Sequence, residues 1–252
     1  MITEAAGAGH VRRVTCRLLF ALVGVSVVLS AGAAQHEEVP GDAALSRHMH
    51  EHLSTIRAVK QFIIAGQLAG MREPAAWLAE HDAAPGLPSG WQPYVAELRQ
   101  HAKDTLAANH LVFAAASFSE MARTCGDCHR AYGVSGVVDP PVGGAPAGDT
   151  LQAQMRRHLW AANRMWEGLI GPSDDAWSAG VAALASIDVD TADIGTPEAV
   201  QPKVEYLLTR IGELGVLVGE LGSSQERSAV YGEFLSLCAD CHSWTGGGPG
   251  VR

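Results

Sequence analysis

The sequence Cys238-Ala239-Asp240-Cys241-His242 has a near-copy 113 positions earlier, Cys125-Gly126-Asp127-Cys128-His129. Both stretches follow the pattern Cys-x-x-Cys-His. In a helix, this spacing places the two thiols on one side of a turn and an imidazole directly after them. The two motifs hold four of the five cysteines in the 252-residue chain, and the fifth, Cys16, lies near the N-terminus. The motifs therefore account for every cysteine beyond the N-terminal segment.

Cys-x-x-Cys-His is the attachment motif of c-type haem. Its two thiols add across the porphyrin vinyl groups, and the adjacent histidine binds the iron. The sequence therefore predicts two covalent haems c, attached through Cys125, Cys128, Cys238 and Cys241, with His129 and His242 as proximal iron ligands. A structural zinc site would need its cysteine pairs roughly 15–20 residues apart. A thioredoxin-like redox pair would need a βαβ pattern, which surrounds neither motif.

The chain repeats itself around the two motifs. Met49-His50-Glu51-His52-Leu53 matches Met155-Arg156-Arg157-His158-Leu159 at an offset of 106, and Gln92-Pro93 matches Gln201-Pro202 at an offset of 109. The stretch between the copies contains Pro140-Pro141 and Gly143-Gly144, a composition typical of linkers. We therefore predict a first haem-binding unit over 40–133, a linker over 134–149 and a second unit over 150–245.

The periodicity within each copy is helical, because apolar residues recur at i, i+3, i+4 and i+7. We predict four helices per copy, with Asp42 and Asp149 as the N-caps of the two first helices. The second helices surround Trp77 and Trp177, and Pro93 and Pro202 lie in the first turns of the third. The fourth helices run directly into the motifs. Alternating β-branched runs are almost absent, so we expect an all-α fold with the cofactors in helical cores.

Residues 1–34 have the order of a secretory signal peptide. Arg12, Arg13 and Arg17 form a basic region, 18–29 is apolar, and small residues follow at 31–34. This order predicts export to the periplasm. The apolar stretch is short for a bilayer span, so we expect no stable membrane span after cleavage, with an uncleaved anchor as the alternative. The net charge of -9 argues against nucleic acid as a partner.

Each copy resembles the cytochrome c′/cytochrome c-556 family, in which the haem motif comes near the end of the last of four helices. The residues that carry the resemblance are the two motifs, followed by the aromatic residues Tyr132 and Trp244. The resemblance covers most of 42–133 and 150–245. It implies two tandem antiparallel four-helix bundles, each holding one haem c. Family members often form dimers, so the resemblance also leaves a homodimer open.

In that family, the other axial position of the iron faces the first helix. Cytochromes c-556 place a methionine there, and cytochromes c′ place an apolar residue that leaves the iron five-coordinate. The candidates here are Met49 and His52 in the first copy and Met155 and His158 in the second. In the sequence, the loop glycines Gly66 and Gly171 follow the methionines at the spacing usual in the family. Their spacing from the histidines is shorter than usual. This favours Met49 and Met155 as sixth ligands and keeps His52 and His158 as the alternative.

Iron with two protein ligands offers no open position to a substrate, so we predict an electron-transfer protein rather than an enzyme. Its partners would be periplasmic redox proteins. An open sixth position would instead predict a gas-binding protein for NO or CO. Further histidines without counterparts in the second copy are expected to be surface or local packing residues: His48, His50, His81, His101 and His110.

Overall fold

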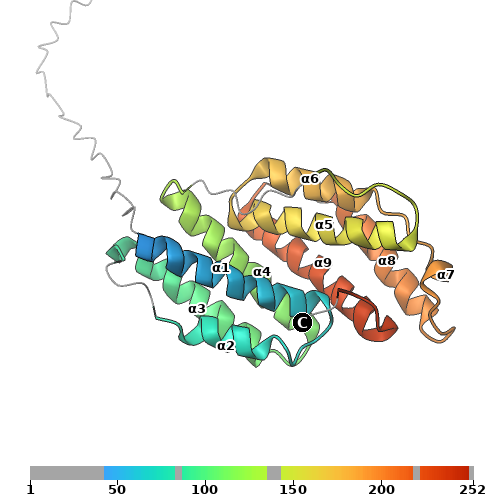
Figure 1. Cartoon of the computed structure of the whole chain (residues 1–252), viewed down its shortest axis with the longest axis horizontal. Coiled ribbons are helices and arrows are strands. Elements are labelled where there is room, and N and C mark those ends of the chain that lie inside the picture. Colours follow the sequence, from blue (N-terminus) through green and yellow to red (C-terminus); the bar gives the residue numbers. More distant parts are fainter. Residues whose placement is uncertain (1–42, 83–86, 135–142, 218–221, 250–252) are drawn as a thin grey trace, which may run out of the picture. The chain divides into compact units, whose positions relative to one another are not determined.

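Helices make up most of the computed structural model, which describes residues 43–82, 87–134, 143–217 and 222–249 (Figure 1). The first copy forms α1 (Ala43–Ile64), α2 (Arg72–Glu80), the 3₁₀ turn η1 (Ser89–Trp91), α3 (Gln92–Ala107) and α4 (Leu111–Ala131). The second forms α5 (Leu151–Ile170), α6 (Asp174–Ala185), α7 (Thr191–Ile194), α8 (Gln201–Leu217) and α9 (Ser224–Thr245). These ranges contain no strand, so the all-α prediction is confirmed.

Two predicted segments fall wholly or partly outside these ranges. The signal peptide over 1–34 is outside the described residues, and so is the part of the linker over 135–142. The predicted N-cap Asp42 also lies outside them. Within the ranges that the structure does describe, no helix combines the length and apolar character needed to cross a membrane.

Local signals in the sequence set several helix ends. Pro93 and Pro202 lie in the first turns of α3 and α8, as predicted, because proline there removes no helical hydrogen bond. The helix α9 begins with a capping box between Ser223 and Glu226. The N-cap of α5 differs from the prediction: it is Thr150, one residue after Asp149, and its hydroxyl accepts a hydrogen bond from the Ala153 amide at 3.3 Å.

The two sequence copies pack against each other within one compact unit, His36–Arg252. The most extensive helix contacts join α4 to α9 and α5 to α6, followed by α3 to α4. Figure 1 shows α4 and α9 side by side, between the helices of the first copy and those of the second. Each copy's first helix also contacts the other copy's last helix, α1 with α9 and α5 with α4.

A single hydrophobic core runs through both copies. Its largest fully buried side chains include Phe118 from α4 and Tyr231 and Phe234 from α9. The Tyr231 hydroxyl donates a hydrogen bond to the Ala162 carbonyl of α5 at 3.0 Å, which satisfies the polar end of a buried side chain. The core therefore depends on helices from both halves of the sequence.

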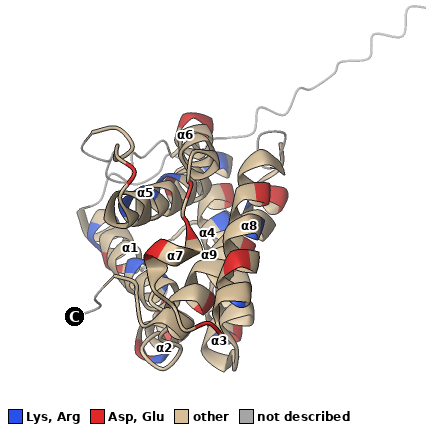
Figure 2. Cartoon of the chain, turned by 90° about the vertical axis from the view of Figure 1, so that its right-hand side faces the viewer, with Lys and Arg blue, Asp and Glu red and all other residues tan. Residues whose placement is uncertain are grey.

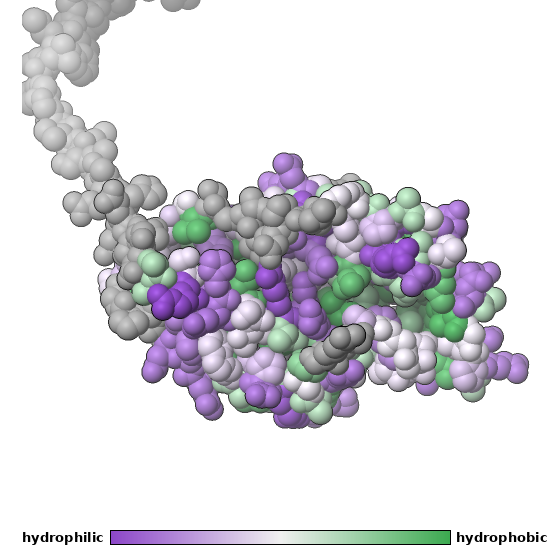
Figure 3. Space-filling view, viewed as in Figure 1, coloured by the Kyte–Doolittle hydropathy of each residue, from purple (hydrophilic) through white to green (hydrophobic). Residues whose placement is uncertain are grey.

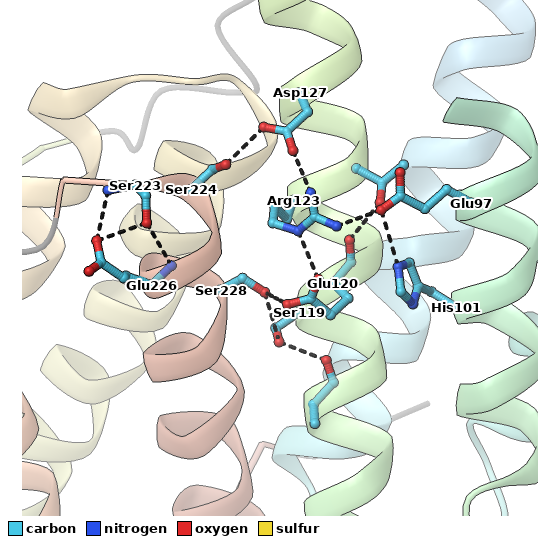
Figure 4. A network of polar contacts seen from close by, with 12 residues as sticks. Glu97, His101, Ser119, Glu120, Arg123, Asp127, Ser223, Ser224, Glu226 and Ser228 are labelled. Carbon is cyan, nitrogen blue, oxygen red and sulfur yellow. Dashed lines mark hydrogen bonds and ion pairs between the residues drawn. The ribbon is translucent and has the colours of Figure 1, made fainter. Parts of the chain in front are cut away.

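A polar network ties α4 to both α3 and α9 (Figure 4). The Arg123 guanidinium donates to three carboxylates, Glu97 at 2.5 Å, Glu120 at 2.7 Å and Asp127 at 2.5 Å. Burial opposes the charged form of Arg123, but the hydrogen bonds and charges of Glu120 and Glu97 outweigh it and raise the pKa of Arg123. From α9, Ser228 donates to Glu120 at 2.6 Å and Ser224 donates to Asp127 at 2.9 Å. One guanidinium thus holds carboxylates that also bind the second copy.

Lys60 forms a buried polar link between α1 and α5. Its Nζ donates to Asn163 Oδ1 at 2.8 Å and lies 4.0 Å from the centre of the Trp166 ring. Burial lowers the pKa of Lys60 to about 7, and nearby Arg57 adds to this effect while Glu167 opposes it. The amine is therefore poorly protonated above neutral pH in the folded protein.

This lowered pKa predicts a pH dependence of stability. Between pH 7 and the ordinary lysine value of 10.5, the unfolded chain holds a proton that the folded chain lacks. Stability should therefore rise with pH across this window, by about 1.4 kcal/mol per pH unit from this residue. Urea unfolding at pH 7 and pH 9 should show this gain in the wild type relative to Lys60→Met. An equal pH response in both proteins would contradict the lowered pKa.

Candidate functional site

The two Cys-x-x-Cys-His motifs lie in the last turns of α4 and α9. All four of their cysteines are free thiols, and Cys238 is buried while Cys125, Cys128 and Cys241 are partly exposed. The helical geometry places both thiols of a motif and its histidine beside one another, as the spacing predicted.

In the second copy, the structure brings the predicted site residues together in one pocket. The helix α9 contributes Cys238, Cys241 and His242, and α5 contributes Met155 and His158. Apolar residues complete the wall, with Leu207 and Ile211 from α8 and Ile64 from the end of α1. Figure 3 shows a hollow bordered by apolar residues. In the same view in Figure 1, this region is formed by α5, α8 and α9. Both sixth-ligand candidates of this copy thus share a pocket with the motif.

Each motif histidine binds the end of the other copy's first helix. His129 Nδ1 bonds to the Ile170 carbonyl oxygen at 2.6 Å, and His242 Nδ1 bonds to the Ile64 carbonyl oxygen at 2.5 Å. Ile64 and Ile170 are equivalent positions of the repeat, at the offset of 106. Because a carbonyl only accepts, each Nδ1 carries the proton, and each Nε2 keeps a lone pair. A hydrogen bond of this kind fixes the orientation of a metal-ligating imidazole.

These contacts between each motif and the other copy's first helix bring the helix backbones very close together. A Cβ atom added to Gly126 would lie 1.9 Å from the Leu169 carbonyl oxygen at the end of α5. At the matching contact, a Cβ added to Gly66, which has φ +70°, would lie 2.8 Å from the Ala239 carbonyl oxygen of α9. Glycine at these two positions allows the approach that the histidine hydrogen bonds require.

Burial keeps the motif thiols uncharged at neutral pH. It raises the pKa of Cys125 and of Cys238 to about 12 and that of Cys128 to about 11. The pKa of Cys241 is raised for the same reason. These surroundings favour a neutral sulfur over a thiolate. A neutral thioether sulfur suits the same surroundings, and the thiols therefore fit covalent attachment to a large apolar group.

His158 is the buried polar residue of the second pocket. Its Nε2 has no hydrogen-bond partner among the described residues, and burial, followed by nearby His242 and Arg157, lowers its pKa to about 4. The imidazole is therefore neutral and has an unused nitrogen. An iron ion would satisfy that nitrogen, so this donor is compatible with haem iron. Met155 lines the same pocket and is partly buried.

In the first copy, the two sixth-ligand candidates differ in their surroundings. Met49 is 39% exposed. His52 lies instead in a group of histidines, with ring centroids 4.5 Å from His48 and 5.2 Å from His81. Burial lowers the pKa of His52 to about 4, and His48, His81 and Arg99 add to the effect. The prediction that His48 and His81 are plain surface or packing residues missed this cluster.

A polar cavity adjoins the second site. His158 lines it from α5, and acidic side chains line it from the α6–α8 connection and from α8: Asp188, Asp190 and Glu205. Figure 2 shows acidic residues beside α7 and along α8. The corresponding neighbours of His52 are the cationic Arg99 and two further histidines. The two candidate sites therefore have different electrostatic surroundings although their motifs are nearly identical.

The sequence thus predicted the residues that meet in the second pocket, but not the carbonyl partners of the motif histidines. The first motif contained one signal for the close approach to the other copy's first helix. Gly126 occupies the motif position at which the second copy has Ala239. The signal for the histidine cluster was the i, i+4 spacing of His48 and His52. Comparisons of the chain with models of protein families, with curated proteins and with solved structures found no match.

Proposed function

We propose that this chain is an exported dihaem c-type cytochrome that transfers electrons between periplasmic redox partners. Covalent haem would be held by the cysteines of the two motifs, with the motif histidines as proximal ligands. The observation that carries the proposal is the pairing of each motif with an imidazole whose Nδ1 is bound by a carbonyl, at 2.6 Å for His129 and 2.5 Å for His242. This arrangement leaves each Nε2 available to iron.

The helix order supports the finer fold proposal of two tandem antiparallel four-helix bundles. The first would consist of α1, α2, α3 and α4, and the second of α5, α6, α8 and α9. In each bundle, the first helix carries the sixth-ligand candidates and the last helix carries the motif. We keep Met49 and Met155 as the proposed sixth ligands, with His52 and His158 as the alternative.

The residues of the chain would serve this function in three ways. Haem iron held by two protein ligands cycles between ferrous and ferric states, which is the chemistry the cofactor supplies. The cysteines fix the cofactor, and the carbonyls of Ile64 and Ile170 orient the proximal imidazoles. Apolar residues such as Leu207 and Ile211 limit water around the second site. The proposal includes no substrate step and therefore no enzymatic activity.

The mass of the exported protein tests the proposal. We expect the chain, produced with a cytochrome c maturation system, to exceed its polypeptide mass by two haem masses. The double variant Cys125→Ser/Cys128→Ser should carry one haem and retain the spectrum of the second site, and Cys238→Ser/Cys241→Ser should do the reverse. A wild-type mass that includes no haem would overturn the proposal.

The spectrum of the reduced protein tests whether the sixth position is filled. With two protein ligands at each iron, we expect carbon monoxide to leave the spectrum almost unchanged, because no coordination position is open. Met155→Ala or His158→Ala should then open the second iron to carbon monoxide, depending on which side chain binds it. Rapid binding of carbon monoxide by the wild type would favour the gas-binding function instead.

A further inference from the structure

Three imidazoles from two helices meet on one side of the first copy. His48 and His52 lie one turn apart on α1, and His81 follows directly after α2. One ring nitrogen of each can be chosen so that all three atoms lie within 4.8 Å of one another. The ring centroids lie 4.5–5.2 Å apart. Such an arrangement of nitrogen donors does not arise from the helix pattern of either segment alone.

The cluster contains an unsatisfied polar atom. His52 Nε2 is buried and has no hydrogen-bond partner in the described part of the chain. An unpaired polar atom away from water costs about 1–3 kcal/mol. Neither of its histidine neighbours, His48 or His81, supplies a hydrogen bond to it. A ligand that accepts the nitrogen lone pair would remove this cost.

Neighbouring side chains pack against the rings of the cluster. Trp77 stacks on His81 with centroids 3.8 Å apart and meets the edge of His52 at 5.3 Å. Arg99 Nε donates to the His81 carbonyl oxygen at 3.1 Å, which fixes the backbone at the end of α2. The Arg99 guanidinium also lies 3.7 Å from Asp82, so part of its positive charge is balanced. Its remaining charge opposes a cation and limits the affinity.

We propose that His48, His52 and His81 form a binding site for one divalent transition-metal ion of the zinc type. Three neutral imidazoles are common zinc donors, and a fourth tetrahedral position would remain for water. Zinc–nitrogen bonds of about 2.0–2.1 Å require nitrogen atoms about 3.4 Å apart, so the rings have to close by about 1 Å. The half-buried side chains of His48 and His81 leave room for that rotation.

Among the described residues of the second copy, no such group of donors is present. Gln154 stands where the first copy has His48, and its side chain is already used: its Oε1 accepts hydrogen bonds from Arg157 and from the Asp188 amide. His158, the equivalent of His52, lines the pocket of the motif instead. The metal site would therefore belong to the first copy alone. The metal site goes beyond the proposed electron-transfer function. It has one consequence for that function: His52 would bind this metal, and Met49 would be the sixth ligand of the first haem.

Zinc titration of the full-length protein tests the site. After treatment with a chelator, calorimetry should show saturable binding of Zn²⁺ that His81→Ala removes. Changes outside the ligand set of a metal site lower affinity about 10- to 100-fold, so loss of a ligand should lower it at least about 100-fold. The control His50→Ala lies on the same helix, exposed and outside the cluster, and should leave binding unchanged.

The variants separate this proposal from the haem proposal. His52→Ala should lose Zn²⁺ binding while the haem absorption spectrum stays the same, and circular dichroism should confirm that each variant keeps its helices. His48→Gln offers a second variant of similar shape. The proposal is overturned if His81→Ala and His48→Gln bind Zn²⁺ as the wild type does, or if His52→Ala changes the spectrum of the first haem. A protein that carries no haem but loses Zn²⁺ binding on His81→Ala would refute the cytochrome function and support the metal site.

Discussion

Gly126→Ala is expected to lower the free energy of unfolding by about 3 kcal/mol, the upper end of the usual cost of overpacking. The new Cβ would lie 1.9 Å from the Leu169 carbonyl oxygen, and this atom belongs to a helix backbone that cannot rotate away. The end of α5 must therefore move, which should also weaken the bond between His129 and the Ile170 carbonyl. Urea unfolding, monitored by circular dichroism, measures the loss.

The chain supplies a matched control. A Cβ at Gly212 in α8 would meet nothing within 4 Å, so Gly212→Ala should be neutral or stabilise the protein by up to about 1 kcal/mol. The motif itself tolerates alanine, since the second copy has Ala239 at the equivalent position. Equal effects of the two substitutions would show that α4 and α5 do not approach as closely as described.

Cutting the chain at the linker should leave the two halves bound to each other, and either half produced alone should not fold stably. Separation would expose apolar surfaces of α4 and α9, which meet in one of the two most extensive helix contacts. Each large apolar side chain that becomes exposed costs about 1.5–3 kcal/mol. Because domains are stable by only about 5–15 kcal/mol, exposure of a few such side chains is enough to unfold a half.

A protease site placed at the exposed pair Gly143-Gly144 makes this measurable. After cleavage, the fragments should elute together in gel filtration and separate only in denaturant. Each fragment made alone should bind a dye that reports exposed apolar surface. Two fragments that elute separately and keep cooperative unfolding transitions would mean that each copy has an independent core.

Features of the fold that depend on neighbouring residues were predictable from the sequence. Proline in a first turn acts within one turn of helix, so Pro93 and Pro202 marked helix starts correctly. The prediction of Asp149 as N-cap was wrong by one residue, because Thr150 can cap the helix equally well at the next position. The meeting of Met155 and His158 with the second motif followed from the repeat and the family resemblance.

Contacts between distant segments were not predictable in the same way. The partner of His242 is 178 positions away, and its acceptor is a backbone carbonyl, which leaves no trace in the identity of Ile64. The position of His81 depends on how α2 returns along α1, and helical periodicity does not specify that path. Helix patterns define which faces are apolar, but they leave open which apolar face meets which.

The reciprocal bonds of His129 and His242 have the form of an isologous contact, in which each partner offers the other the same pair of groups. Such a contact normally relates two identical subunits by a two-fold axis, and here it lies within a single polypeptide. The halves therefore cannot diverge independently during evolution. A substitution that shifts the end of α1 alters the imidazole of the distant second motif, so natural variation near Ile64 should be correlated with variation around His242.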